Sequence, residues 1–176
     1  MGAAGDSIGR ALSFRSPTLE RTRAIAAELA RAWLEVAGGS GLVVGLHGGL
    51  GVGKTVFVKG LADGLGLDGD TVSSPTFVLA NQYLVSRDVV LNHVDFYRIE
   101  LAAELESMGF FDLMAPGALL AVEWADRFEH ALPRQRLDVV IEREGEALRR
   151  CGARATGDLP CEVFERWQQR AGLDGG

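Results

Sequence analysis

The chain has 176 residues, 47% of them hydrophobic and 24% charged, which is enough for one domain with a substantial core. No apolar run approaches the roughly 20 residues of a membrane-spanning helix. Residues 1–15 also lack the basic start and long apolar stretch of a signal peptide, so we expect a cytoplasmic protein. The net charge of −6 argues against a broad nucleic-acid-binding face, and we expect no strong direct binding to nucleic acid.

The start of the chain is small and polar, and we expect residues 1–15 to be loosely ordered, with a short strand near residues 12–14. Ser16 and Pro17 are typical of a helix N-cap followed by proline in the first turn. Apolar residues then recur at helical spacing up to the glycine-rich residues 38–41, which predicts a helix that ends there.

A glycine-rich stretch follows the apolar run of residues 42–46, and its sequence is Gly48-Gly49-Leu50-Gly51-Val52-Gly53-Lys54-Thr55. It matches the phosphate-binding loop pattern G-x-x-x-x-G-K-[ST], and the apolar residues on both sides predict the strand and the helix that this motif requires. Glycines let backbone N–H groups surround an anion. Lys54 can place its ammonium against the outer phosphates, and the Thr55 hydroxyl can bind Mg²⁺. The alternative is a glycine-rich turn in a chain with 23 glycines, but the flanking elements favour the phosphate loop.

The number and position of the lysines indicate which nucleotide the loop would bind. The only lysines are Lys54 and Lys59, whereas the guanine-reading N-K-x-D pattern of GTPases requires a lysine beyond the phosphate loop. We therefore expect ATP rather than GTP.

The remaining residues predict more strands and helices in one domain. A turn at Arg87 and Asp88 joins two strands into an antiparallel hairpin, so a purely parallel sheet is not expected. The fold class is α/β, a three-layer P-loop NTPase-like sandwich with a mixed central sheet that includes antiparallel strands, over residues 1–176. The later strands are expected at residues 78–85, 89–94, 118–122, 137–141 and 148–156, and the helices at residues 56–64, 101–108 and 163–171.

Two acids, Asp95 and Glu123, follow apolar strands directly. Ligands of such sheets gather beyond the carboxyl ends of the strands. One acid could bind magnesium while the other orients or deprotonates a water; a solvated carboxylate at a strand end is the alternative for each.

Other polar residues have two interpretations each. Ser74 and Thr76 could form a switch segment near a γ-phosphate, or a rigid turn. Trp124 could border the nucleotide or lie in the core. Arg98 could contact a phosphate or a partner carboxylate, but a surface arginine is the favoured interpretation. The isolated histidines His47 and His93 are not favoured as general bases.

Cys151 and Cys161 have nine residues between them and no cysteine–histidine cluster around them. We interpret them as reduced structural thiols, with zinc binding as the weaker alternative and a disulfide left open.

Taken together, these motifs closely resemble the bacterial TsaE (YjeE) family over roughly residues 16–142. No family motif is visible after residue 143. The resemblance is carried by residues 22–26, the loop of residues 48–55, Ser74-Pro75-Thr76-Phe77, His93-Val94-Asp95-Phe96-Tyr97-Arg98, Glu104-Leu105, Met108-Gly109 and Glu123-Trp124.

The resemblance implies an ATPase, slow alone and stimulated by partners, that is required to form threonylcarbamoyladenosine at position 37 of tRNA. Its partners would be the two transferase proteins of TsaD and TsaB type, and its cofactors ATP and Mg²⁺. The implied catalytic residues are Lys54, Asp95 and Glu123, with Thr55 and Glu123 as metal ligands. The implied nucleotide-binding residues are Gly48, Gly49, Leu50, Gly51, Val52, Gly53, Lys54, Thr55, Val56, Ser74, Thr76, Trp124 and, through a loose match, Thr22.

Two departures and two rival functions remain. Family members usually carry an acid where this chain has Gly49, and often a glycine where it has Ala26. A small-molecule kinase would also fit the loop, although no arginine-bearing lid is evident, and phosphorylation of an acceptor would support it. A nucleotide-gated binding module without hydrolysis is the other rival, and Asp95 and Glu123 count against it.

Overall fold

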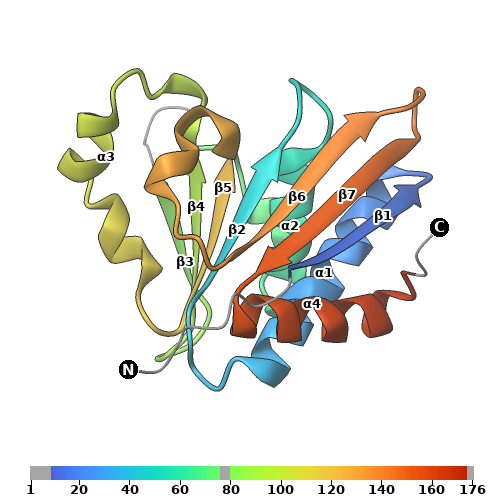
Figure 1. Cartoon of the computed structure of the whole chain (residues 1–176), viewed down its shortest axis with the longest axis horizontal. Coiled ribbons are helices and arrows are strands. Elements are labelled where there is room, and N and C mark those ends of the chain that lie inside the picture. Colours follow the sequence, from blue (N-terminus) through green and yellow to red (C-terminus); the bar gives the residue numbers. More distant parts are fainter. Residues whose placement is uncertain (1–8, 76–79, 174–176) are drawn as a thin grey trace.

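The structure is a computed structural model that describes residues 9–75 and 80–173, and a mixed sheet organises it (Figure 1). The strand order is β1-β7-β6-β2-β5-β4-β3. β2 pairs in parallel with β5 and β6, and β4 with β5. β3, β7 and β1 join antiparallel, which confirms the mixed α/β fold and the predicted hairpin of β3 and β4. The strands are β1 (Arg10–Ser16), β2 (Leu42–His47), β3 (Ala80–Leu84), β4 (Val90–Asp95), β5 (Ala118–Glu123), β6 (Arg136–Arg143) and β7 (Arg149–Thr156).

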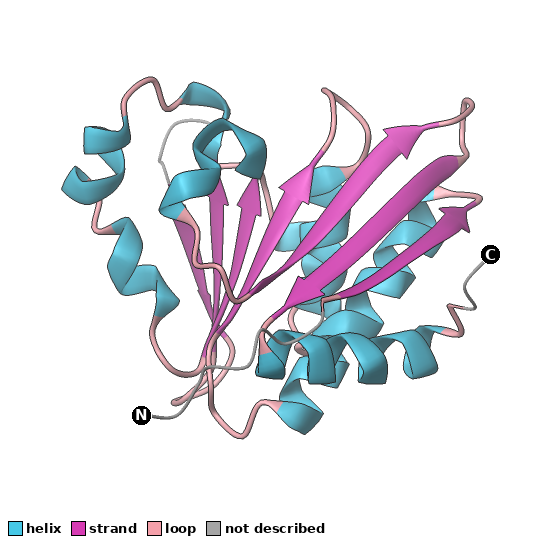
Figure 2. Cartoon of the chain, in the orientation of Figure 1, coloured by secondary structure: helices cyan, strands magenta, loops and turns pink. Residues whose placement is uncertain are grey.

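Helices cover both faces of the sheet centre (Figure 2). The α-helices are α1 (Leu19–Val36), α2 (Lys54–Gly64), α3 (Ala102–Ser107) and α4 (Asp158–Ala171), and the 3₁₀ helices are η1 (Gly69–Thr71), η2 (Phe96–Arg98), η3 (Phe110–Met114) and η4 (Ala125–Ala131). The side chains of β5 alternate between two cores, because successive strand residues point to opposite faces. Leu119 and Ala121 belong to the same core as side chains of α1, α2 and α4, whereas Leu120 and Val122 belong to the core that includes side chains of α3, η2, η3 and η4.

The beginning of the fold differs from the prediction in two respects. The short strand expected near residues 12–14 is present but longer, because residues 10–16 form the edge strand β1 where part of a loose start was expected. Residues 1–8 lie outside the described part. Ser16 ends β1, where it pairs with Arg149 of β7, so its backbone belongs to the sheet and it is not the N-cap. Thr18 is the N-cap of α1, and its hydroxyl accepts a hydrogen bond from the backbone N–H of Arg21 at 3.1 Å.

The carboxyl ends of β2, β4, β5 and β6 lie along one edge of the sheet, at the top of Figure 1. The glycine-rich loop leaves β2 at this edge and leads into α2. Asp95 and Glu123 end neighbouring parallel strands and are paired in register. The topology therefore brings the loop and both predicted acids together.

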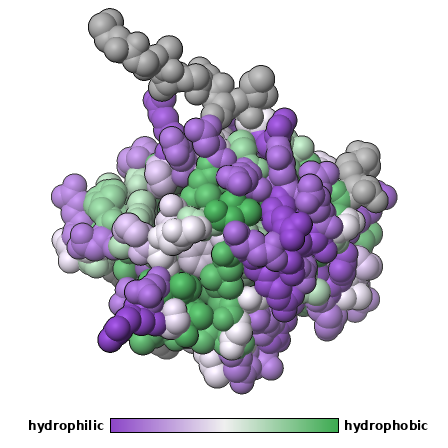
Figure 3. Space-filling view, turned by 90° about the horizontal axis from the view of Figure 1, so that it is seen from below, coloured by the Kyte–Doolittle hydropathy of each residue, from purple (hydrophilic) through white to green (hydrophobic). Residues whose placement is uncertain are grey.

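Away from this edge, the surface is ordinary for a folded domain. Seen from the opposite end, hydrophobic patches stand among hydrophilic regions (Figure 3), as is normal because apolar atoms contribute much of any protein surface. None of the described helices is both long and apolar enough to cross a membrane. Cys151 and Cys161 are not joined in a disulfide, and burial raises the pKa of the Cys151 thiol to about 11.

Candidate functional site

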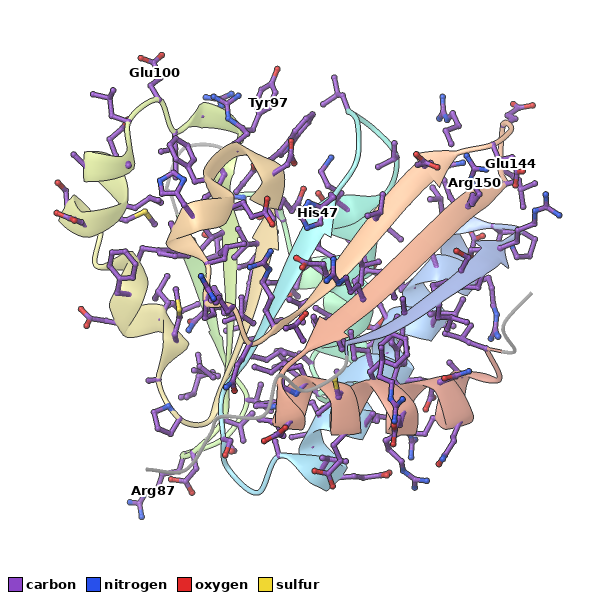
Figure 4. The ribbon with its side chains drawn as sticks, in the orientation of Figure 1. His47, Arg87, Tyr97, Glu100, Glu144 and Arg150 are labelled. Carbon is purple, nitrogen blue, oxygen red and sulfur yellow. The ribbon has the colours of Figure 1, made fainter. Side chains whose placement is uncertain are left out.

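A cavity of about 630 Å³ opens beside the loop at the carboxyl edge of the sheet. Its walls come from the loop, the start of α1 and α2, and the ends of β4 and β5. Figure 4 shows Tyr97 at this edge, while Arg87, in the turn between β3 and β4, lies at the opposite end. The lining residues are Leu19, Leu50, Gly51, Gly53, Lys54, Thr55, Val56, Ser74, Pro75, Asp95, Tyr97, Arg98, Glu123 and Trp124.

The loop has a backbone conformation that depends on glycine at three positions. Gly48, Gly51 and Gly53 have φ angles of 133°, 70° and 115°, which L-residues with side chains rarely adopt. Gly49 is different, because a Cβ built there would lie 3.9 Å from the nearest side-chain atom, Val52 Cγ1. Nothing in the backbone requires glycine at position 49, so the acid usual in the resembling family has room there.

Lys54 begins α2 and is nearly buried, with 5% of its surface exposed. Its Nζ donates hydrogen bonds of 2.7 Å to the carbonyl oxygens of Gly48 and Gly49 and lies 3.9 Å from the centre of the Trp124 ring. Burial lowers the pKa of Lys54, and the nearby acids, chiefly Glu123 and Asp95, oppose that shift. An anion in the cavity would therefore stabilise the ammonium group.

Glu123 lies at the centre of a buried hydrogen-bonded group. Its Oε1 accepts a hydrogen bond from the Thr55 hydroxyl at 2.8 Å and lies 2.9 Å from His93 Nε2. A carboxylate can only accept, so Nε2 carries the ring proton. His93 is fully buried, and within the described ranges its Nδ1 has no hydrogen-bond partner. The histidine therefore orients Glu123.

Thr55 and Glu123 together fit a magnesium ion. They offer a hydroxyl and a carboxylate, which are the oxygen ligands that this hard cation takes. No cluster of three or more His, Cys, Asp or Glu that could bind a metal occurs in residues 9–75 and 80–173. Magnesium sites built on nucleotides need only one or two protein ligands, because phosphates and waters supply the rest.

Asp95 is fixed by two hydrogen bonds at the end of β4. Its Oδ1 accepts from the backbone N–H of Tyr97 at 2.8 Å, which caps η2, and its Oδ2 accepts from the Ser74 hydroxyl at 3.0 Å. The Ser74 segment and the strand-end acid thus meet at the cavity wall. Such a carboxylate has further lone pairs with which to bind a water.

Trp124 adopts a strained backbone at the cavity. Its φ of 56° makes it the one non-glycine residue of the described chain in the left-handed region, where strain is often associated with function. The Tyr97 ring stacks beside it with centroids 5.0 Å apart. Arg98 also lines the cavity, so its position is more specific than the surface interpretation implied.

Comparison with known proteins places the chain in a family. The sequence profile described as "Threonylcarbamoyl adenosine biosynthesis protein TsaE" matches residues 16–151. The chain belongs to the TsaE family. The match extends past residue 143, so the view that the family resemblance ends there is wrong.

The family's tRNA threonylcarbamoyladenosine biosynthesis proteins include one from Bacillus subtilis, 38% identical over 160 residues that span 88% of this chain and 94% of the relative. Another, from Haemophilus influenzae, is 33% identical over 106 residues, or 60% of this chain and 66% of the relative. The crystal structure of Bacillus subtilis YdiB superposes with a TM-score of 0.70 at 33% identity, covering 93% of this chain and 97% of that one.

Some residues expected in the TsaE-family site lie elsewhere. The Thr22 side chain is buried and its hydroxyl is 2.8 Å from the Ser16 hydroxyl, so Leu19, one turn earlier in α1, forms the cavity wall instead. Thr76 lies outside the described residues. Gly48, Gly49 and Val52 support the site through carbonyl oxygens.

Sequence reasoning also missed residues that matter at the site. His93 and Tyr97 stand in the motif around Asp95, which was the only signal for them. Asp126 acts on Lys54 through its charge, and Arg149 reaches the loop from β7. No local pattern marks either of these two.

Proposed function

We propose that this chain is an ATPase that acts in threonylcarbamoyladenosine formation at position 37 of tRNA. Its proposed partners are the two transferase proteins of TsaD and TsaB type, and its proposed cofactors are ATP and Mg²⁺. The observation that supports this most is the convergence of Lys54, Thr55 and Glu123 at one cavity beside a glycine-rich loop. Membership of the TsaE family supports the biosynthetic role.

The loop and Lys54 would bind the phosphates. The N-terminus of α2 adds a partial positive charge of roughly half an elementary charge at the same place. Lys54 Nζ donates hydrogen bonds to two carbonyl oxygens of the loop. Phosphate oxygens would compete well for this ammonium group, because hydrogen bonds between charged partners are stronger. The lysine would therefore move from the loop carbonyls to the outer phosphates.

Thr55 and Glu123 would bind Mg²⁺. The ion would neutralise charge that develops on the phosphates during transfer. His93 fixes the orientation of Glu123 from the buried side, so the carboxylate needs little reorganisation to act as a ligand.

Asp95 would serve hydrolysis through a water molecule. Tyr97 and Ser74 fix the orientation of its carboxylate by donating one hydrogen bond to each oxygen. A carboxylate fixed in this way can accept the proton of an attacking water or orient the water in line with the phosphate. Ser74 would then link the presence of the γ-phosphate to the segment that follows it.

The test is threonylcarbamoyladenosine formation in tRNA by the two transferase proteins, with and without this chain. Wild-type protein should support repeated turnover and Lys54→Ala should not. Lys59→Ala is the matched control, because Lys59 also lies on α2 but is absent from the cavity lining. Modification that proceeds equally with the wild type and Lys54→Ala would reject the proposal.

A further inference from the structure

Arg149 is a buried cation that contacts the phosphate loop. It begins β7, and 1% of its surface is exposed. Its Nε donates a hydrogen bond of 2.7 Å to the carbonyl oxygen of Val52, 97 positions away in the chain. Its Nη1 donates to the carbonyl oxygens of Glu146 and Leu148 at 3.3 and 3.2 Å.

No carboxylate balances this charge in the described part of the chain. The ion pairs found there do not include Arg149, and the three acceptors of its hydrogen bonds are neutral carbonyl groups. The thiol of Cys151, two residues along β7, does not supply a negative charge, because burial raises its pKa to about 11. A buried guanidinium without a counter-ion costs free energy that a nearby anion would recover.

The contact with Val52 also sets the direction of a loop N–H group. In a trans peptide the C=O and the following N–H point to opposite sides. Because the Val52 carbonyl points to Arg149, the Gly53 N–H points the other way, and Gly53 lines the cavity. An inward N–H of this kind is what a phosphate loop uses to bind an anion.

The hairpin of β6 and β7 supports the loop at a second point. A Cβ placed on Gly48 would lie 2.2 Å from the carbonyl oxygen of Ile141 in β6, so the loop backbone packs directly on that strand. Figure 4 labels Glu144 and Arg150, which lie near the turn that joins β6 to β7. The hairpin thus contacts the loop at its first glycine and at Val52.

We propose that Arg149 is a positioning residue of the phosphate site. It holds the Val52–Gly53 peptide with its N–H toward the ligand, and its charge is balanced by the phosphates when nucleotide binds. This inference rests on the proposed function, since it requires that the cavity binds nucleotide phosphates. It assigns to the hairpin a part in nucleotide affinity that the loop motif does not reveal.

The test is ADP affinity, measured by calorimetry on the full chain in Mg²⁺, together with the unfolding temperature of each variant. Arg149→Met should weaken ADP binding tenfold or more, and Arg149→Lys, which keeps the charge, should recover most of that loss. Arg154→Met is the matched control, because Arg154 lies on β7 but is exposed, and it should bind ADP within twofold of wild type. If Arg149→Met does not fold, Arg149→Gln, which keeps an N–H donor without the charge, takes its place under the same criteria.

Two results would overturn the inference. Arg149→Met could bind ADP within twofold of wild type, or Arg149→Lys could lose as much affinity as Arg149→Met, which would leave only a packing role. In either case wild-type binding would leave the proposed nucleotide site intact. A wild-type protein that does not bind ADP would instead reject the nucleotide site itself, and this inference with it.

Discussion

Thr55 and Glu123 are joined by a hydrogen bond of 2.8 Å from the threonine hydroxyl to carboxylate Oε1, although 68 positions separate them in the chain. Thr55 lies in the first turn of α2 and Glu123 ends β5. The hydrogen bond therefore links a helix N-terminus to the end of a strand in the sheet. His93 approaches the same oxygen at 2.9 Å from β4. Residues of α2 and β4 therefore meet at one carboxylate oxygen of β5 beside the glycine-rich loop.

Glu123→Gln should weaken the response to magnesium, because a neutral amide is a poorer ligand for a hard cation than a carboxylate. We expect the Mg²⁺ concentration for half-maximal ATP hydrolysis to rise about tenfold, or about 1.4 kcal/mol. The measurement is a magnesium titration of the hydrolysis rate. Glu100→Gln, which alters an exposed acid at the same edge (Figure 4), should leave the titration unchanged. An unaltered midpoint in Glu123→Gln would exclude Glu123 as a ligand.

Asp95→Asn should separate binding from turnover. The amide oxygen can still accept from Tyr97 N–H and so cap η2, but it is a far weaker base than a carboxylate. We expect ADP affinity within about threefold of wild type and hydrolysis lowered about 100-fold, which is typical for loss of a general base. Both are measured on one preparation, with Asp112→Asn as the control for an exposed acid on η3. Turnover at the wild-type rate would make Asp95 structural.

Trp124 should report on nucleotide binding by its fluorescence. Its ring contacts Lys54 Nζ at 3.9 Å and borders the cavity, so ADP should change its emission as the lysine turns to the phosphates. Trp33 and Trp167 are 2% and 0% exposed and should contribute a constant background. The change should be absent in Trp124→Phe. An equal change in that variant would assign the signal to a core tryptophan.

Asp63 gives a prediction on stability and pH. The hydrogen bond from Arg23, 3.0 Å from Nη2 to Oδ1, is the main cause that lowers the pKa of Asp63 below its usual 3.8. In the window between the two pKa values the unfolded chain binds more protons, so stability rises with pH there. The contribution of Asp63 to stability should therefore be lost as pH falls from about 3.8 through the lower pKa of the folded state.

The check is urea unfolding from pH 6 to pH 3 of wild type and Asp63→Asn. At pH 6 the free energy of unfolding of the variant should be lower by up to about 1 kcal/mol, since the ion pair of Asp63 and Arg23 is partly exposed. This deficit should shrink toward pH 3. A deficit that does not change with pH would show that the ion pair does not contribute to it.

The residues proposed to bind phosphate and metal could be predicted because their signals are local. The loop pattern names Lys54 and Thr55, and an acid directly after an apolar strand names Asp95 and Glu123. The parallel pairing of β4 with β5 then brings the two acids together. Predicting them requires only the rule that ligands gather beyond the carboxyl ends of parallel strands.

The remaining site residues depend on contacts across the fold that no spacing encodes. Arg149 reaches Val52 only because β7 pairs with β6, which in turn pairs with β2. Thr22 was expected at the cavity, but its hydroxyl bonds to Ser16, which β1 holds in the sheet. In both cases strand pairing decides where the side chain lies.

We propose that this chain is an ATPase whose activity the transferase complex stimulates. The most direct measurement is ATP hydrolysis by the purified protein, alone and mixed with the two transferase proteins. We predict slow hydrolysis alone, a clear rise on mixing, loss of that rise in Lys54→Ala and its retention in Lys59→Ala. Hydrolysis that does not respond to the partners, or that persists in Lys54→Ala, would contradict the account.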